Sequence, residues 1–272
     1  MSRVLISDKL SPKAEQIFLD RGIEVDVITG LERDDLIKII DKYDGLAIRS
    51  STKVTEKVLD AANNLKVVGR AGIGVDNVDI PYATLKGVAV MNTPFGNAIT
   101  TAEHAISMTM SLVRNIPQAN QSTLLGKWEK SKYMGTEITG KTIGIIGCGN
   151  IGSIVADRAL GLKMKVIAYD PFLTEEKALA IKVRKVELDE LLKISDIITL
   201  HVPLTDQTAN IINKKTLENC KDGVFVINCA RGGLIDEKDL KDSLDSGKVA
   251  GAAIDVYEFE PAKESIFFGM EN

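Results

Sequence analysis

The stretch Lys141-Thr-Ile-Gly-Ile-Ile-Gly-Cys-Gly-Asn-Ile-Gly152 decides the fold, because an apolar strand runs into a glycine loop and then into a helix. The spacing Gly147-x-Gly149-x-x-Gly152 permits a tight turn, a close approach of backbone to a pyrophosphate, and close packing of helix on strand. The phosphates then face the free N–H groups and the positive dipole end of the helix. The stretch therefore predicts a dinucleotide site in a parallel α/β domain.

A second apolar run ends in Tyr169-Asp170, where the next parallel strand should end. A carboxylate at this place accepts hydrogen bonds from the adenosine ribose hydroxyls and repels a 2′-phosphate. The glycine spacing alone is a weak signal, since its simplest reading is a glycine-rich loop, but strand, helix and acid together favour a true site. The cofactor predicted from these residues is NAD rather than NADP.

The composition is that of an ordinary soluble globular protein, with 272 residues and 44% hydrophobic side chains, enough for two modest domains. The formal net charge is −4, and no block of like charge occurs. We therefore expect neither a nucleic acid nor an anionic membrane as partner. No apolar run reaches the length of a membrane span, and Met1–Asp8 is typical of a first strand rather than a signal peptide, so we expect a cytoplasmic protein.

The cysteines are odd in number and lack the spacing of a metal site: Cys148, Cys220 and Cys229. Free thiols in a reducing compartment are the expectation, with Cys148 a small filler in the glycine turn. No metal is predicted.

Short apolar runs alternate with helical patterns, which indicates α/β architecture with parallel sheets. Ser11-Pro12 is typical of an N-cap followed by a first-turn proline. One series of strands is expected near residues 4–7, 24–28, 45–48, 66–68 and 88–91. A second series begins at Thr142 and continues near residues 165–169, 185–186, 196–200, 224–228 and 251–254.

Between the two series lies a long apolar helical pattern from Ile99 to Val113, which we interpret as a bridging helix. A polar stretch, Gln118–Gly140, follows and contains the only tryptophan, Trp128. The pattern predicts a first domain over residues 1–97 and a second over residues 98–272 that includes the bridging helix.

Three turns follow strands of the first series: Arg49-Ser-Ser51, Gly69–Gly74 and Asn92–Asn97. Ligands of open parallel sheets bind beyond the carboxyl ends of the strands. Each turn alone is more often only a turn, but their shared position and their composition favour a site for a small anion such as a carboxylate or phosphate. The candidate substrate-binding residues are Arg49, Ser50, Arg70, Gly72, Gly74 and Asn97.

Two loops of the second series carry chemistry, Cys229–Asp236 and Asp255–Pro261. Arg231 is suited to bind a 2-oxo or 2-hydroxy carboxylate bidentately and to polarise the carbonyl. Asp255 is placed to hold a nicotinamide, and Glu260 to orient a histidine base. On spacing alone, an ordinary surface arginine and a solvated loop acid explain these residues equally well.

Longer motifs bring in a resemblance. The glycine loop with Asp170, His201-Val-Pro-Leu204, Asn228–Gly233 and Asp255–Pro261 resemble the D-isomer-specific 2-hydroxyacid dehydrogenase family. Within it, further segments resemble the branch that acts on 3-phosphoglycerate: Arg49–Thr55, Val68–Asn77, Met91–Pro94, Gly126–Trp128 and Met134–Glu137. The likeness covers essentially the whole chain. It implies a flavodoxin-like, substrate-binding first domain and a Rossmann, NAD-binding second domain.

The resemblance implies oxidation of 3-phosphoglycerate to 3-phosphohydroxypyruvate with NAD, in serine biosynthesis. By match of motif Arg231 and Glu260 are catalytic, and Arg49 and Arg70 hold the substrate's phosphate or carboxylate. The resemblance also implies a homodimer or higher homo-oligomer that uses the bridging helix and the Trp128 segment. The cofactor-binding positions that we carry over or predict are Ile73, Gly147, Gly149, Asn150, Ile151, Gly152, Asp170, Val202, Cys229, Arg231 and Asp255.

One departure concerns the general base. The resemblance implies a histidine in a Pro-His-Leu-Gly-type segment after Glu260-Pro261, and the sequence ends at Gly269-Met-Glu-Asn272 before such a segment. His104 is expected to pack within the bridging helix, and His201 to end a strand beside the cofactor. We therefore expect a truncated chain that binds NADH with little or no turnover and whose first domain lacks its C-terminal return helix.

Two alternatives stay open at this stage. One is a reductase of glyoxylate, hydroxypyruvate or another 2-oxo acid on the same scaffold. The other is a non-catalytic NAD-binding interaction protein, which the absence of the histidine favours and the presence of Arg231 and Glu260 disfavours.

Overall fold

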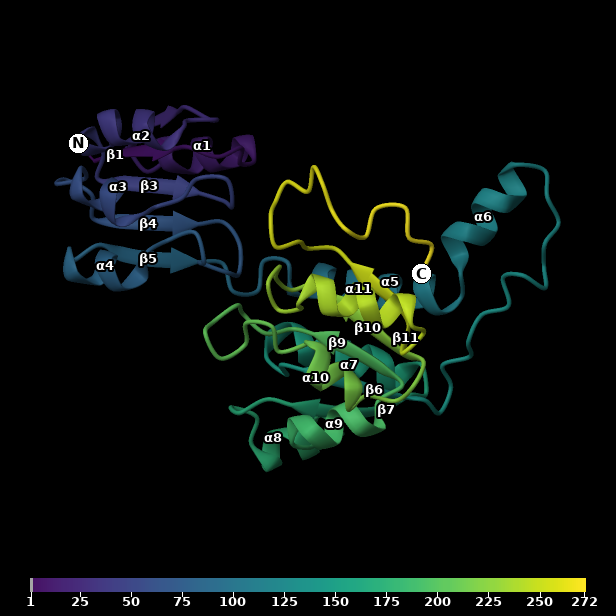
Figure 1. Cartoon of the computed structure of the whole chain (residues 1–272). Helices are drawn as coiled ribbons and strands as arrows, with labels where there is room; N and C mark the ends of the chain where they lie inside the picture. Colours follow the sequence, from purple (N-terminus) through teal and green to yellow (C-terminus); the bar gives the residue numbers. More distant parts are fainter. Residues whose placement is uncertain (1) are drawn as a thin grey trace. The chain divides into compact units, whose positions relative to one another are not determined.

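A computed structural model describes residues 2–272, and it divides at Asn97 and Ala98 into two compact units (Figure 1). Unit 1 comprises the described residues up to Asn97, and unit 2 is Ala98–Asn272. Each unit is built on its own parallel sheet. The prediction of α/β architecture with two parallel sheets is confirmed.

The sheet of unit 1 has the strand order β2-β1-β3-β4-β5, and every neighbouring pair is parallel. This is the flavodoxin-like order of a doubly wound sheet. The fully buried side chains of Leu5, Ile48 and Val68 form its core with the flanking helices. The strands are β1 (Arg3–Ile6), β2 (Glu24–Val27), β3 (Gly45–Ile48), β4 (Val67–Arg70) and β5 (Ala89–Asn92).

The helices of unit 1 are short, and the first of them begins at a side-chain cap. The Ser11 hydroxyl accepts a hydrogen bond from the Lys13 N–H at 3.4 Å, and Pro12 opens the first turn, as predicted. The described helices are α1 (Pro12–Leu19), α2 (Arg33–Ile39), the 3₁₀ turn η1 (Ile40–Lys42), α3 (Glu56–Asp60) and α4 (Ile80–Leu85).

The sheet of unit 2 has the strand order β11-β10-β9-β6-β7-β8. This is the Rossmann arrangement, in which strands β6 and β9 are neighbours and the strand order reverses between them. Ligands of such sheets bind outside the carboxyl ends of the strands at that reversal. The strands are β6 (Thr142–Ile146), β7 (Lys165–Tyr169), β8 (Arg184–Lys185), β9 (Ile197–Leu200), β10 (Val224–Asn228) and β11 (Val249–Ile254).

Helix α5 (Ala98–Val113) confirms the apolar helical pattern and contacts helix α7 (Asn150–Gly161) and strands β10 and β11. Its buried face is made of small side chains, Ala102 and Ala105 among them, which lets the helix approach the core closely. The remaining helices of unit 2 are α6 (Ile116–Leu124), α8 (Glu175–Ala180), α9 (Leu188–Ile194), α10 (Lys214–Glu218) and α11 (Glu237–Asp245).

The polar stretch after α5 contains a helix that was not predicted from its composition. Helix α6 covers Ile116–Leu124, with Asn115 before it at a positive φ of 52° and a proline in its first turn. The low apolar content hides the helical period, while the proline is a valid start signal.

Across residues 2–272 no helix combines the length and the apolar character that a bilayer span requires. All three cysteines are buried and free among the same residues.

Candidate dinucleotide site and active-site loops

The glycine loop of unit 2 makes a tight turn in which two of the glycines leave no room for a side chain. Gly147 has a φ of 92°, and a Cβ on it would lie 2.6 Å from the His201 carbonyl oxygen. A Cβ on Gly152 would lie 2.0 Å from the Gly147 carbonyl oxygen. A Cβ on Gly149 would meet nothing within 4 Å, so the loop is open there. Backbone packing thus sets the turn and the seat of the helix.

Helix α7 begins directly after this loop, with Gly149 as N-cap and Asn150 and Ile151 in the first turn. Gly149 has no side chain to cap the helix, so the first turn of this twelve-residue helix lies at the open part of the loop. The N–H groups of this turn and the helix dipole suit a phosphate. The predicted cofactor-binding residues from Gly147 to Gly152 therefore lie together in one turn.

Asp170 lies at the end of β7 and is fastened to the glycine loop. Its Oδ2 accepts a hydrogen bond from the Cys148 N–H at 2.8 Å, and its Oδ1 accepts one from the Phe172 N–H at 2.8 Å. A carboxylate has about four acceptor sites, so both oxygens keep capacity for ribose hydroxyls. Burial, and then the charge of Asp170, raise the pKa of the Cys148 thiol to about 11, which leaves it an inert filler. Loop, helix end and acid together fit a dinucleotide.

His201 and Val202 follow β9 and form the opposite wall of the loop. The His201 N–H donates to the Ile146 carbonyl at 2.8 Å, and a Cβ on Gly147 would come within 2.6 Å of Val202 Cγ1. The His201 Nε2 lies 3.0 Å from the Thr199 hydroxyl, and burial lowers the pKa of His201 to about 4. A neutral imidazole in this setting supports packing beside the loop rather than proton transfer at neutral pH.

Cys229 and Asp255 follow β10 and β11, and Asn228 holds both loops in place. The Asn228 side-chain amide donates to the Arg231 carbonyl at 2.8 Å, and its Oδ1 accepts from the Ala230 N–H at 3.0 Å. The Asn228 carbonyl also accepts from the Asp255 N–H at 3.0 Å. Asn228 is 2% exposed, so this buried amide positions the turn that carries Arg231.

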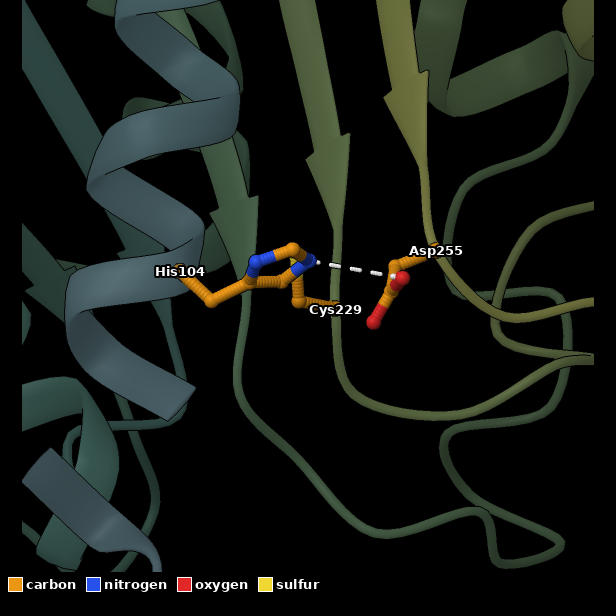
Figure 2. Close-up of side chains that lie close together, drawn as sticks. All are labelled: His104, Cys229 and Asp255. Carbon is orange, nitrogen blue, oxygen red and sulfur yellow. Dashed lines mark ion pairs between the residues drawn. The ribbon is translucent and has the colours of Figure 1, made fainter. Parts of the chain in front are cut away.

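The structure corrects the interpretation of His104. Its side chain is 46% exposed rather than packed, and its Nε2 lies 3.3 Å from Asp255 Oδ1 (Figure 2). Cys229 lies beside the pair, and the three ligand-type atoms are within 4.8 Å of one another. Sequence reasoning missed this cluster because helix α5 and the ends of β10 and β11 are far apart in the chain, and no spacing rule connects them.

The two candidate catalytic residues lie on loops that touch each other. A Cβ on Gly232 would lie 1.8 Å from the Tyr257 carbonyl oxygen, so the loop of Arg231 packs backbone against backbone on the loop of Glu260. Arg231 Nη1 donates to the Ala230 carbonyl at 2.6 Å, and Glu260 Oε1 accepts from the Tyr257 N–H at 3.1 Å. Each side chain thus donates to or accepts from the backbone of its own loop, and the two loops pack against each other.

In unit 1 the turn at Arg49 and Ser50 is held by Asp8, a residue that no sequence motif marks. Asp8 Oδ2 accepts from the Arg49 N–H at 2.6 Å and the Thr52 N–H at 3.1 Å, and its Oδ1 accepts from the Thr52 hydroxyl at 2.8 Å. The Asn77 amide donates to the Arg49 carbonyl at 2.7 Å. Arg49 and Ser50 are exposed at the carboxyl end of β3.

The other predicted substrate residues follow β4 and β5. The Arg70 guanidinium lies over Gly72, where a Cβ would come within 1.8 Å of Nη1. The Asn92 amide donates to the Ile73 carbonyl at 2.6 Å, which ties this turn to the end of β5. Gly74 is partly buried in the same turn, and Asn97 is exposed at the end of unit 1. All these residues lie at or beyond the carboxyl ends of parallel strands.

A cavity of about 550 Å³ lies beside the Gly232–Gly233 turn and includes no residue of the glycine loop. It presents three carboxylates, Asp236, Glu237 and Glu258, against one ammonium group, Lys238. This charge balance does not suit a phosphorylated ligand. The helix end after Gly149 is therefore the better phosphate site in unit 2.

Comparison with known proteins agrees with this geometry. Residues 106–272 match the family described as D-isomer specific 2-hydroxyacid dehydrogenase, NAD binding domain. This confirms NAD as the cofactor predicted from Asp170 and the glycine loop.

A D-3-phosphoglycerate dehydrogenase from Archaeoglobus fulgidus is 50% identical over 259 residues, which are 95% of this chain and 49% of the relative. The human D-3-phosphoglycerate dehydrogenase is 47% identical over 272 residues, 100% of this chain and 51% of the relative. The chain spans about half the length of the curated relatives it matches.

Among solved structures, a glyoxylate reductase from Paecilomyes thermophila superposes with a TM-score of 0.88 at 32% identity. The likeness covers 96% of this chain and 83% of the reductase.

Proposed function

The chain belongs to the D-isomer specific 2-hydroxyacid dehydrogenase family, and from that premise we propose that the whole protein oxidises 3-phosphoglycerate to 3-phosphohydroxypyruvate with NAD, a reaction of serine biosynthesis. The observation that carries the substrate is the 47–50% identity to enzymes named D-3-phosphoglycerate dehydrogenase over at least 95% of this chain. NAD, when bound, accepts the hydride that leaves C2 of the hydroxy acid. The hydroxyl proton passes to a histidine base.

In this proposal Arg231 binds the substrate carboxylate and Glu260 orients the histidine. The Arg231 guanidinium is a planar fork of N–H donors that matches the two oxygens of a carboxylate, and its Nη1 donates to the Ala230 carbonyl at 2.6 Å. Glu260 is exposed and keeps one carboxylate oxygen beyond its bond to the Tyr257 N–H. The histidine itself is proposed to come from a Pro-His-Leu-Gly-type segment.

Arg49 and Arg70 are the proposed holders of the phosphate. Arg49 is exposed on a turn whose backbone is fixed by Asp8 and Asn77, so its guanidinium is presented by a rigid base. Arg70 lies at the end of the neighbouring strand β4, paired in register with Ile48. Two guanidinium groups at one sheet edge supply the charge and the donors that a phosphate requires.

A reductase of glyoxylate or hydroxypyruvate is the second candidate, favoured by the likeness to the glyoxylate reductase. Arg49→Ala and Arg70→Ala separate the two candidates. Under our proposal each substitution lowers kcat/KM for 3-phosphohydroxypyruvate about 10- to 100-fold more than for glyoxylate, because one hydrogen bond to a charged group is lost. Equal losses for both substrates favour the reductase.

We also propose a cytoplasmic homodimer or higher homo-oligomer that uses the bridging helix α5 and the Trp128 segment. The support is a run of exposed apolar side chains, with Leu124 74%, Trp128 86% and Met134 82% exposed. Sedimentation of the wild type and of Trp128→Ser tests the oligomer. A monomeric wild type, or a variant that associates as the wild type does, contradicts it.

The test of the main proposal is a steady-state substrate panel with NAD and NADP, run on residues 1–272 and on a version with a Pro-His-Leu-Gly-type segment joined after Asn272. We expect both to bind NADH and the extended version to turn over 3-phosphoglycerate. Loss of the base costs about 10²- to 10⁴-fold in rate, so residues 1–272 alone should be nearly inactive. NADH binding without turnover of any acid in either version supports the interaction protein instead.

A further inference from the structure

The cluster of His104, Cys229 and Asp255 combines an imidazole, a thiol and a carboxylate from three different elements. His104 comes from α5, Cys229 follows β10 and Asp255 follows β11 (Figure 2). Cys229 and Asp255 are also predicted cofactor-binding residues, whereas no predicted binding role covers His104 or the three side chains as a group.

The three atoms suit a zinc ion in type and in spacing. Sulfur, nitrogen and carboxylate oxygen are the ligands of tetrahedral Zn²⁺, with bonds of about 2.0 to 2.3 Å, so that neighbouring ligand atoms lie about 3.3 to 3.8 Å apart. His104 Nε2 and Asp255 Oδ1 are 3.3 Å apart, which matches one edge of such a tetrahedron. The Cys229 sulfur lies within 4.8 Å of both atoms. A fourth position remains for water.

The backbone that carries the ligands is already fixed. The Asp255 N–H donates to the Asn228 carbonyl at 3.0 Å, which couples the residue before Cys229 to Asp255. Ala102 and Ala105 flank His104 on α5 and belong to the same buried cluster as Cys229. A preformed frame lowers the ordering cost of binding an ion.

Access to the cluster is from one side. The Cys229 thiol is buried, and it loses its proton to solvent when it binds a cation. His104 and Asp255 are 46% and 48% exposed, which gives the ion a way in.

We propose that unit 2, when free of NAD, binds one thiophilic divalent cation such as Zn²⁺ through His104 Nε2, Cys229 Sγ and an Asp255 carboxylate oxygen. Metal and NAD exclude each other, because two of the three ligands are residues that the proposed function assigns to the cofactor. The exclusion rests on the proposed function, whereas the binding of the ion does not. The ion is therefore a competitive inhibitor with respect to NAD.

The first experiment titrates the whole chain, without NAD, with Co²⁺ as a spectroscopic stand-in for Zn²⁺. We expect one equivalent to bind with a near-ultraviolet sulfur-to-cobalt band that Zn²⁺ removes and Mg²⁺ does not. Cys229→Ser abolishes the band. Cys220→Ser, a change at another buried free cysteine, retains it. Absence of the band in the wild type, or its loss in Cys220→Ser alone, overturns the site.

His104→Gln keeps the proposal testable if Cys229→Ser fails to fold, since His104 is half exposed. Loss of one ligand should weaken Co²⁺ binding by at least about tenfold, the loss that follows removal of even an outer hydrogen-bond partner. Thermal melting of each variant without metal reports folding. A folded His104→Gln that binds Co²⁺ with wild-type affinity overturns the assignment of His104.

The second experiment measures NADH binding by calorimetry at increasing Zn²⁺. The apparent Kd of the wild type should rise in proportion to Zn²⁺, and that of His104→Gln should rise at least about tenfold less steeply. An NADH affinity unaffected by saturating Zn²⁺ overturns the exclusion. A chain that shows the cobalt band but binds no NADH contradicts the proposed function and leaves the metal site standing, so the two failures are distinguishable.

Discussion

In unit 2 the glycine loop is shaped by backbone packed on backbone, whereas in unit 1 the turn at Arg49 is held by the carboxylate of Asp8. Gly152 packs against the Gly147 carbonyl with no room for a Cβ. The sequence shows this contact because only glycine can occupy the position. Asp8 accepts three hydrogen bonds from Arg49 and Thr52, and nothing in the order of residues marks it. A close backbone contact can therefore be predicted from glycine spacing, whereas the side-chain contacts of Asp8 can be identified only from the folded structure. Substitutions that strike one mechanism and spare the other test this difference.

The largest effect is expected from Gly152→Ala. The new Cβ would sit 2.0 Å from the Gly147 carbonyl oxygen, so the loop or the helix has to shift. We expect the free energy of NADH binding to weaken by about 3 kcal/mol, which calorimetry measures as a Kd about 100-fold higher. Gly161→Ala, at the other end of the same helix, meets nothing within 4 Å and should bind NADH normally. Wild-type affinity in Gly152→Ala would contradict the steric account.

Asp8→Ala should give the next largest effect and should leave unit 2 alone. It removes the acceptor for two N–H groups and one hydroxyl in a buried setting, which costs about 2 to 3 kcal/mol of unfolding free energy. Hydrogen exchange should rise in unit 1, while the Kd for NADH stays unchanged. Asp41→Ala removes an exposed acceptor from Asn63 and should change stability by less than about 0.5 kcal/mol. An equal loss in both variants counts against a special role for Asp8.

Acid should weaken unit 2 through His201. Its folded pKa of about 4 lies below the ordinary value of 6.5, so the unfolded chain binds the proton more tightly. Stability is then lost as the pH falls from 6.5 towards 4, by about 1.4 kcal/mol per pH unit and about 2 kcal/mol at pH 5. Both histidines of the chain, His104 and His201, lie in unit 2, so unit 1 has no counterpart.

Denaturant titrations between pH 7 and 4.5 measure this slope. His201→Gln should flatten it, because the variant has no imidazole to protonate at this position. Hydrogen exchange at pH 5 should rise in β6 and β9 before it rises in unit 1. A slope that survives in His201→Gln assigns the acid sensitivity to other groups.

The smallest effect is a change of cofactor preference. Asp170→Asn keeps one acceptor oxygen but loses the negative charge, so NADH should bind about tenfold more weakly and NADPH more tightly than in the wild type. Fluorescence titration with both cofactors measures the ratio. Asp157→Asn, an exposed acid on α7, is the matched control and should leave the ratio unchanged. An unaltered ratio in Asp170→Asn would place selectivity elsewhere.

The positions of the strands and the glycine loop were predictable because hydrophobic period and glycine spacing are local signals. Strand β10 was predicted with its observed bounds, 224–228, since an apolar run follows Lys221-Asp222-Gly223 and ends at Asn228. Helix α6 was missed because its composition is polar. The contact between His104 and Asp255 was missed for another reason, since it depends on packing of α5 against the sheet rather than on any local pattern.

The close approach of Gly232 to the Tyr257 carbonyl has a consequence for how new specificities arise on this scaffold. No methyl group fits between the segments that carry Arg231 and Glu260. The two segments are therefore packed as one unit, and an insertion in one requires the other to move. Under the proposed function, variation in substrate is then left to the turns of unit 1, such as the one at Arg49, so a redesign would move the two segments of unit 2 together and vary unit 1.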